Sequence, residues 1–216
     1  MAWEEKRRTK ISLLMPHKSE YVTLEFMESY NRLLLPSPYR ILHRRGPLPI
    51  DIARNTLVEE ALEDDPEHIL FLDDDLILPE NTVYTLLSHR YPIVSVLYAD
   101  KVGRACVFRL NSEGTPEPIP WDMVHGKLAY VGAVGFGAIL IDARVFKLAK
   151  KKGLWPPFKY EYDPVNNPEG FSEDQFFCTS VARKLGFPIL VDGRIPTGHV
   201  FTGRLIDDKR ITYLTP

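Results

Sequence analysis

Three consecutive aspartates, Asp73-Asp74-Asp75, give the strongest chemical signal, because they lie between the apolar runs 69–72 and 76–78. Two carboxylates about 5 Å apart in a partly desolvated site repel each other by roughly 3 kcal/mol at an effective dielectric constant near 20. A divalent cation removes this repulsion, and hard cations prefer carboxylate oxygens. In extended backbone, Asp73 and Asp75 point to one side and Asp74 to the other. The triplet predicts a cation site, and the alternative is a solvated acidic turn or a helix N-terminus that attracts acids.

A second acidic pair, Glu173-Asp174, directly follows Ser172. Ser172 and Gln175 form a capping-box pattern, which predicts the start of a helix. A carboxylate at this place could act as a general base. The helix dipole also favours acids in a first turn without any catalytic role, so both interpretations stay open from these residues alone.

Three other polar residues are candidates for binding. Arg54 carries a fork of donors suited to phosphate groups, and Asn55 follows it on the same expected helix. The simpler alternative is that both pair with Glu59 on the helix surface. His199 follows the last expected strand, where it could bind a metal ion, although a structural imidazole is the ordinary alternative.

Segments of strand and helix length alternate over the first hundred residues, a pattern typical of βαβ units and a largely parallel sheet. The acidic triplet would then lie at the carboxyl end of a central strand, where open α/β sheets bind ligands. Asp51 is expected to cap the second helix. The inward face of that helix is expected to consist of Ile52, Leu57, Val58, Ala61 and Leu62. The expected strands span 11–15, 39–43, 68–72 and 93–97, and the expected helices 22–34, 51–62 and 79–87.

After residue 100 the segments become shorter, which predicts extra strands with hairpin-like links. Asp142 is expected to cap a helix that ends near Gly153, and Ser172 to open another that ends near Gly186. The Pro-rich stretch 154–170 is the best candidate for a functional loop. The expected strands of this part span 105–110, 130–134, 138–141 and 189–191.

Composition excludes several classes of protein. The 216 residues are 44% hydrophobic and 26% charged, which is typical of a globular domain rather than a disordered chain. The net charge of −2 gives no general attraction to nucleic acid, so no nucleic-acid partner is expected. No apolar run reaches the roughly 20 residues of a transmembrane segment, and no signal-peptide pattern is present, so we expect a cytoplasmic protein. Cys106 and Cys178 are expected to be reduced thiols.

Taken together, these residues resemble the GT-A fold glycosyltransferases, particularly the family-2-like members. In that family an Arg-Asn pair on a helix, here Arg54-Asn55, precedes a strand that ends in a DxD motif, here Asp73-Asp74-Asp75. The first strand ending in Pro16, the acids Glu173-Asp174 and the late His199 are also similar, so the likeness covers about residues 10–200.

The resemblance implies an α/β fold of GT-A type, with a Rossmann-like, mostly parallel mixed sheet flanked by helices. It implies one domain over residues 1–216. Within it, a nucleotide-sugar-binding half is expected at about 10–100, an acceptor and catalytic half at about 101–200, and a C-terminal tail at 201–216.

The activity implied is metal-dependent transfer of a sugar from a nucleotide diphosphate donor, a UDP- or GDP-sugar, to a carbohydrate or other hydroxyl acceptor. Mn²⁺ or Mg²⁺ would be held by Asp73, Asp75 and His199, with Asp73 acting through the metal's waters or on the nucleotide ribose. Asp174 would be the general base of an inverting reaction, with Glu173 as the alternate. The resemblance assigns donor binding to Pro16, Arg54, Asn55, Asp73, Asp74 and Gly135.

Glycines and aromatic residues leave alternatives open. Gly132, Gly135 and Gly137 do not have the G-x-G-x-x-G order of a dinucleotide fingerprint, which disfavours a Rossmann oxidoreductase. They either allow the backbone to approach the donor sugar or allow tight strand packing. Aromatic residues in the late loop either stack on an acceptor sugar or pack onto the domain. These are Trp155, Phe158, Tyr160 and Tyr162.

Two departures from the family pattern leave the substrates undefined. His43-Arg44-Arg45 stands after the second strand, where family members usually have an acid that reads the nucleobase. The chain is also short for this fold, which leaves room for a partner subunit, including a second copy in a homo-oligomer, to supply part of the acceptor site.

Two other functions compete. A haloacid-dehalogenase-like phosphohydrolase also has an apolar strand followed by Asp-x-Asp, but its motif normally ends the first strand and precedes Thr or Val, where this chain has Ile77. A non-catalytic binder of nucleotide sugars or glycans is the other alternative.

Overall fold

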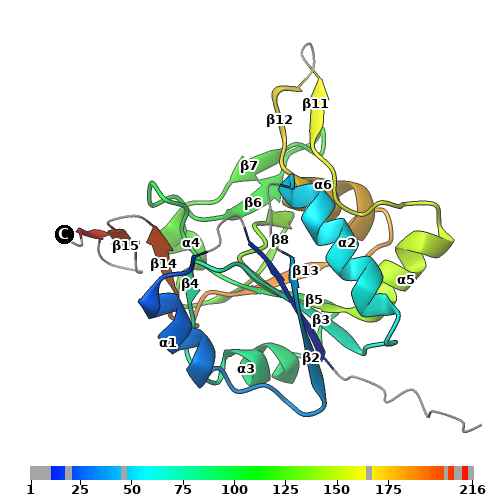
Figure 1. Cartoon of the computed structure of the whole chain (residues 1–216). Coiled ribbons are helices and arrows are strands. Elements are labelled where there is room, and N and C mark those ends of the chain that lie inside the picture. Colours follow the sequence, from blue (N-terminus) through cyan, green and yellow to red (C-terminus); the bar gives the residue numbers. More distant parts are fainter. Residues whose placement is uncertain are drawn as a thin grey trace, which may run out of the picture.

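The centre of the molecule is a mixed β-sheet. The computed structural model describes residues 11–17, 21–44, 48–163, 167–201, 204–206 and 211–213, and within these ranges the sheet has seven strands in the order β2-β1-β3-β10-β5-β13-β8 (Figure 1). Five strands run in one direction, whereas β10 and β8 are antiparallel to their neighbours. The expected mostly parallel mixed sheet is therefore confirmed. Its strands are β1 (Ile11–Pro16), β2 (Tyr39–Arg44), β3 (His68–Leu72), β5 (Ile93–Val96), β8 (Leu128–Val131), β10 (Ala138–Asp142) and β13 (Ile189–Asp192).

Helices cover both faces of this sheet (Figure 1). Side chains of β3 alternate between two hydrophobic clusters, with Ile69 and Phe71 in one and Leu70 and Leu72 in the other. Helices α2 and α5 and the late helical segment pack into the first cluster, and α1 and α3 into the second. The helices are α1 (Leu24–Arg32), α2 (Ile50–Leu62), α3 (Thr82–Ser88), α4 (Trp121–Val124), α5 (Ala143–Lys151), α6 (Glu173–Phe176) and the π-helix η1 (Phe177–Ala182).

Helix α2 begins one residue earlier than expected, and this changes its buried face. Pro49 occupies the N-cap position, so the prediction that Asp51 caps the helix is wrong. Ile52 is 45% exposed, whereas Ala53 and Arg54 are buried with Leu57, Val58 and Ala61. The sheet therefore contacts a stripe that contains a charged residue, which apolar periodicity alone could not indicate.

The second half adds three smaller sheets. The expected strand 130–134 divides at Gly132, and its two parts join different sheets. A Cβ at Gly132 would lie 2.4 Å from Leu110 Cγ, so the glycine allows close packing at this point. The stretch 154–170 contains a strand of the projecting β11–β12 hairpin (Figure 1). The smaller sheets comprise β6 (Val107–Leu110), β7 (Pro116–Pro118) and β9 (Ala133–Val134); β11 (Glu161–Asp163) and β12 (Asn167–Phe171); and β4 (Leu76–Ile77), β14 (Gly198–Phe201), β15 (Arg204–Ile206) and β16 (Ile211–Tyr213).

Two local predictions in this half are confirmed. The Asp142 side chain caps α5 by accepting a hydrogen bond from the backbone N–H of Arg144. Ser172 and Gln175 form the expected capping box at the start of α6. These caps fix where each helix begins, and the second one fixes the direction of the acids in the first turn of α6.

Candidate active site

The acidic triplet follows β3 and lines a cavity of about 220 Å³. Its backbone forms a turn in which the Asp73 carbonyl accepts a hydrogen bond from Leu76 N–H, so the expected extended backbone with Asp74 pointing away is wrong. Since the chain turns here, all three carboxylates reach the cavity. The predicted site residues that line it are Pro16, Arg54, Asp73, Asp74, Asp75, Glu173 and Asp174.

Arg54 lies at the base of this cavity and binds one carboxylate of each acidic group. Its Nε donates to Glu173 Oε1 at 3.1 Å, and its Nη2 donates to Asp73 Oδ1 and Oδ2 at 3.0 and 3.3 Å. The Phe71 and Phe136 rings lie 5.3 and 5.6 Å from its guanidinium carbon. Only 3% of the Arg54 side chain is exposed, so its geometry favours holding these acids over contacting a phosphate. The alternative that Arg54 pairs with Glu59 is wrong, because Glu59 accepts from Trp155 Nε1.

Asn55 lies outside the cavity lining. Its Nδ2 donates to the Phe158 carbonyl at 2.7 Å, and its Oδ1 accepts from Phe158 N–H at 3.1 Å. Phe158 is fully buried, so this aromatic residue packs onto the domain. Asn55 therefore anchors the late loop to α2 instead of facing a donor.

Asp75 and His199 meet because β4, directly after the acidic turn, pairs with β14 and places Leu76 opposite His199. His199 Nε2 lies 3.1 Å from Asp75 Oδ2, and Lys101 Nζ lies 3.5 Å from the same oxygen. Burial opposes ionisation of Asp75, but the His199 hydrogen bond and the charges of His199 and Lys101 outweigh it and lower the pKa of Asp75. This carboxylate is therefore ionised at neutral pH.

The Asp75–His199 pair fits a divalent cation. His199 Nδ1 lies 2.7 Å from the Ala99 carbonyl, which can only accept, so Nδ1 carries a proton. In the neutral ring, Nε2 then presents a lone pair to the Asp75 carboxylate, and this arrangement requires a proton or a metal ion between them. Burial lowers the pKa of His199, but the Asp75 hydrogen bond and charge outweigh it and raise the pKa overall.

The protein supplies only part of a metal coordination shell. Among the described residues, no group of three His, Cys, Asp or Glu side chains is arranged to hold a metal ion. Asp73, the third predicted ligand, is turned toward Arg54. Mg²⁺ is commonly bound through one or two carboxylates plus substrate phosphates and water, so this donor set fits a metal that enters with a diphosphate.

The two acids at the start of α6 have different environments. Glu173 is 5% exposed and bonded to Arg54. Asp174 Oδ1 accepts hydrogen bonds from Ser172 Oγ and from Gln175 N–H, the latter at 2.7 Å. Burial and the neighbouring Glu173 charge raise the pKa of Asp174 to about 6. Asp174 is thus the acid better suited to exchange a proton near neutral pH.

Asp74 forms a separate contact at the edge of the cavity. Its Oδ2 accepts from His17 Nδ1 at 2.8 Å, and His17 Nε2 lies 2.8 Å from His43 Nδ1. The two rings come from the adjacent ends of β1 and β2. Each aspartate of the triplet therefore has its own protein cation or histidine, which a solvated turn would not need.

Gly135 lies outside the cavity lining, and the structure favours strand packing over approach to a donor. A Cβ at this position would lie 2.1 Å from Tyr98 Oη. The Tyr98 ring contacts His199 edge-on at 5.8 Å between centroids. The glycine therefore makes room for the ring that supports His199.

Three residues of the cavity, Ile50, Lys101 and Tyr160, are not among the predicted site residues, although Tyr160 was noted as a possible acceptor contact. Lys101 is on the loop after β5, and Tyr160 is on the late loop, where burial and the Glu173 charge raise its pKa to about 12. Tyr160 belongs to the aromatic group noted in the sequence, but Lys101 lies in no recognisable motif.

Comparisons with known proteins agree with this architecture. No family model and no curated protein sequence matches the chain. Among solved structures, A197 from STIV matches with a TM-score of 0.64 and 18% identity, over 96% of this chain and 95% of that one. Residues 1–349 of S. aureus TarS in complex with UDP-GlcNAc match with a TM-score of 0.50 and 15% identity, over 86% of this chain. The fold is of the GT-A type.

The GT-A fold similarity extends over only part of the TarS fragment, because the chain spans 57% of its length.

Within the described residues, none of the helices has the length and apolar character that a membrane span requires.

Proposed function

We propose that this chain is a metal-dependent glycosyltransferase that moves a sugar from a nucleotide diphosphate donor to a hydroxyl acceptor with inversion. The observation that carries this proposal is that Asp75 and Asp174 line one cavity. Asp75 can hold a cation together with His199, which contacts it from outside the cavity lining, and Asp174 can accept a proton. The GT-A type fold supports it. The half of the chain up to about residue 100 would bind the donor, and residues 101–200 would bind the acceptor and carry the base.

In the proposed reaction, the acceptor oxygen attacks the anomeric carbon of the donor sugar while Asp174 takes the hydroxyl proton. A new C–O bond forms, and the bond from the anomeric carbon to the diphosphate breaks. The nucleoside diphosphate leaves with that electron pair. Asp174 must therefore face the side of the sugar opposite the diphosphate, which gives inversion at the anomeric carbon.

The leaving diphosphate needs positive charge, because the cavity lining contains five carboxylates. Mn²⁺ or Mg²⁺ held by Asp75 and His199 would spread the negative charge that develops on the diphosphate. Lys101 is 56% exposed beside Asp75 and can move to a phosphate oxygen when a metal replaces it on the carboxylate. Lys101, rather than buried Arg54, is thus the proposed phosphate contact.

Arg54 has a positioning role in this scheme. It binds Asp73 in the acidic turn and Glu173 next to the proposed base. Arg54 would thus set the spacing between the acidic turn and the first turn of α6. Asp73 remains near enough to act through a water or the nucleotide ribose, as the resemblance implies.

A UDP-sugar is the first donor to test, since the TarS fragment was crystallised with UDP-GlcNAc. The cavity of about 220 Å³ is below the roughly 300–1,000 Å³ typical of whole ligand sites, so we expect it to hold the sugar and diphosphate while the nucleoside extends outside.

The test is a product assay with UDP- and GDP-sugars and Mn²⁺. We expect release of free nucleoside diphosphate, its loss with a chelator, and its loss in Asp75→Ala. Glu80→Ala, an acid outside the cavity, is the control that should retain activity. Release of inorganic phosphate from sugar phosphates instead would support a phosphohydrolase. Donor binding by the wild type without any turnover would support a non-catalytic binder.

A further inference from the structure

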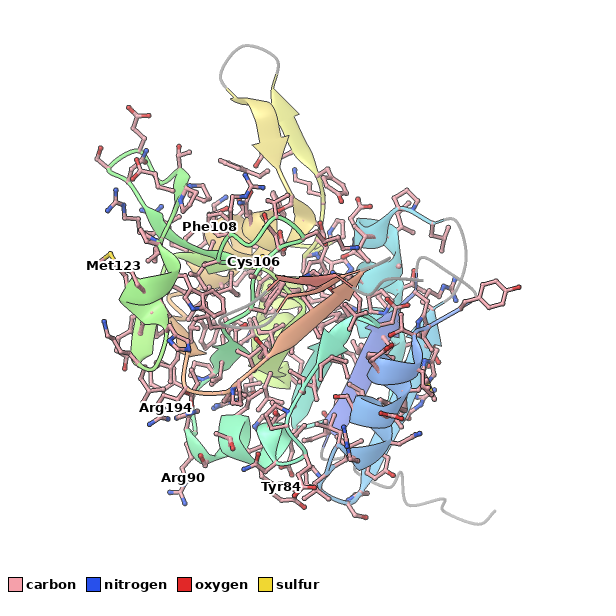
Figure 2. All side chains as sticks on the ribbon, turned by 90° about the vertical axis from the view of Figure 1, so that its left-hand side faces the viewer. Tyr84, Arg90, Cys106, Phe108, Met123 and Arg194 are labelled. Atoms are coloured by element: carbon pink, nitrogen blue, oxygen red, sulfur yellow. The ribbon has the colours of Figure 1, made fainter. Side chains whose placement is uncertain are left out.

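A second cavity, of about 350 Å³, lies between the loop after β5, strands β6 and β7, and the base of the β11–β12 hairpin. Figure 2 labels Cys106 and Phe108, which both line it, near the base of that hairpin. Its volume is within the range of small-molecule sites, roughly 300–1,000 Å³. Nothing described so far uses this space.

The two cavities share a wall. Asp100 lines the second cavity and the adjacent Lys101 lines the first. In the same way Gln175 lines the second and the adjacent Asp174 lines the first. The proposed base is therefore one residue along the chain from the lining of the second cavity.

The electrostatics of Cys106 agree with this proximity. Burial, together with the charges of Asp100 and Asp174, raises the pKa of the Cys106 thiol to about 12. A thiol with so high a pKa is protonated at neutral pH, so Cys106 is a wall of the cavity and not a nucleophile.

The lining combines apolar rings with hydrogen-bonding groups. Phe108 and Phe171 supply aromatic surface. Arg104 is held by a hydrogen bond from its Nε to Asp100 at 2.8 Å, and its terminal nitrogens make no hydrogen bond within the described residues. Gln175 accepts from Ser172 N–H through Oε1, which leaves its amide N–H groups as donors.

We propose that this second cavity is the acceptor site and that the acceptor is a sugar. A pyranose ring has an apolar face that packs on aromatic rings and an edge of hydroxyls that accept from guanidinium and amide donors, which is the combination present here. For transfer, a hydroxyl of the bound sugar would extend past Gln175 toward Asp174, which lines the first cavity. This inference rests on the proposed function for its catalytic meaning, although sugar binding can be measured without it.

The test uses free D-glucose, D-galactose, D-mannose, L-rhamnose and N-acetylglucosamine as probes at millimolar concentration in ligand-observed NMR. We expect at least one to bind the wild type, and Arg104→Ala and Phe171→Ala to weaken its binding by about fivefold or more. Arg109→Ala is the matched control, because Arg109 is an exposed arginine paired with one acid, as Arg104 is, but lies outside the cavity. Its affinity should stay within about twofold of the wild type.

Two results would overturn the inference. Unchanged affinity in Arg104→Ala and Phe171→Ala would show that the sugar binds at another site. No binding of any probe to the wild type would contradict a sugar acceptor. Phe171→Leu keeps the bulk but removes the ring, and it replaces Phe171→Ala if that variant does not fold. Hydrolysis of a UDP-sugar by the wild type, with water as acceptor, tests the proposed function separately. Sugar binding without release of nucleoside diphosphate from UDP- or GDP-sugars, with either water or the bound sugar as acceptor, would leave the cavity assigned as a sugar site and reject only the transferase.

Discussion

The acidic turn after β3 brings three carboxylates to one cavity and the first turn of α6 brings two, and Arg54 binds one carboxylate of each group. The pKa values of two of the other acids, Asp75 and Asp174, shift in opposite directions. His199 and Lys101 lower the pKa of Asp75 against the effect of burial, whereas burial and Glu173 raise the pKa of Asp174 to about 6. Neighbouring cations thus keep one aspartate ionised, as the proposed metal ligand must be, and a neighbouring anion raises the pKa of the other toward the range of the proposed base.

Removing the base should give the largest effect. Asp174→Asn retains an oxygen for Ser172 Oγ and Gln175 N–H but cannot take a proton. We expect kcat to fall about a thousandfold, within the range for loss of a general base, while the donor dissociation constant changes little. Steady-state kinetics and calorimetry would measure both quantities. A kcat within tenfold of the wild type would show that Asp174 is not the base, and Glu173 would then be the next candidate.

Removing Arg54, which binds one acid of each group, should destabilise the protein at both acidic groups. Arg54→Met leaves buried Glu173 and partly buried Asp73 without their partner, and we expect the free energy of unfolding to fall by about 3–5 kcal/mol. Chemical denaturation measures this change. Arg40→Met is the control, since Arg40 also pairs with two acids but at the surface, and its loss should cost less than about 1 kcal/mol. Equal losses of unfolding free energy in Arg54→Met and Arg40→Met would mean that Arg54 does not hold the two acidic groups together.

The raised pKa of Asp174 predicts how activity depends on pH. The base must be ionised, so kcat/KM should be constant well above pH 6 and fall about tenfold per pH unit below it. Glu173→Gln removes the neighbouring negative charge, and the midpoint should therefore move to lower pH. A midpoint that stays in place in Glu173→Gln would show that another group controls the profile.

The smallest effect is expected at Lys101. Lys101→Ala removes the cation next to Asp75, so Mn²⁺ should bind more tightly in the absence of donor, while the donor KM should rise about 3- to 10-fold. Electron paramagnetic resonance of Mn²⁺ and initial rates measure the two changes. Lys147→Ala, which removes a surface pair with Asp65, is the control. Weaker Mn²⁺ binding in Lys101→Ala would contradict competition at Asp75.

Local patterns predicted much of the fold. Strand β3 and the helix cap at Asp142 depend on neighbouring residues, and both match the structure. The position of the acidic triplet after a buried strand likewise placed it at the cavity. The expected cap at Asp51 was wrong because Pro49 ends the preceding segment and starts α2 earlier.

The long-range contacts were less accessible from the sequence. That Arg54 binds Asp73 and Glu173, 19 and 119 residues away, depends on which side chains the sheet brings together. Lys101 belongs to no recognisable sequence motif, and only its contact with Asp75 in the structure identifies it as a site residue. His199 was found through resemblance to a family, since its own surroundings in the sequence are uninformative.

The pairing of β14 with β4 sets an order of assembly. During synthesis the chain emerges from its N-terminal end, so Arg54 and the acidic turn can fold against the early strands first. Asp75 acquires its histidine only when residues 198–201 have left the ribosome and added to β4. An incomplete nascent chain therefore lacks the Asp75–His199 contact, and the proposed cation site is completed only by the last strand that pairs with β4.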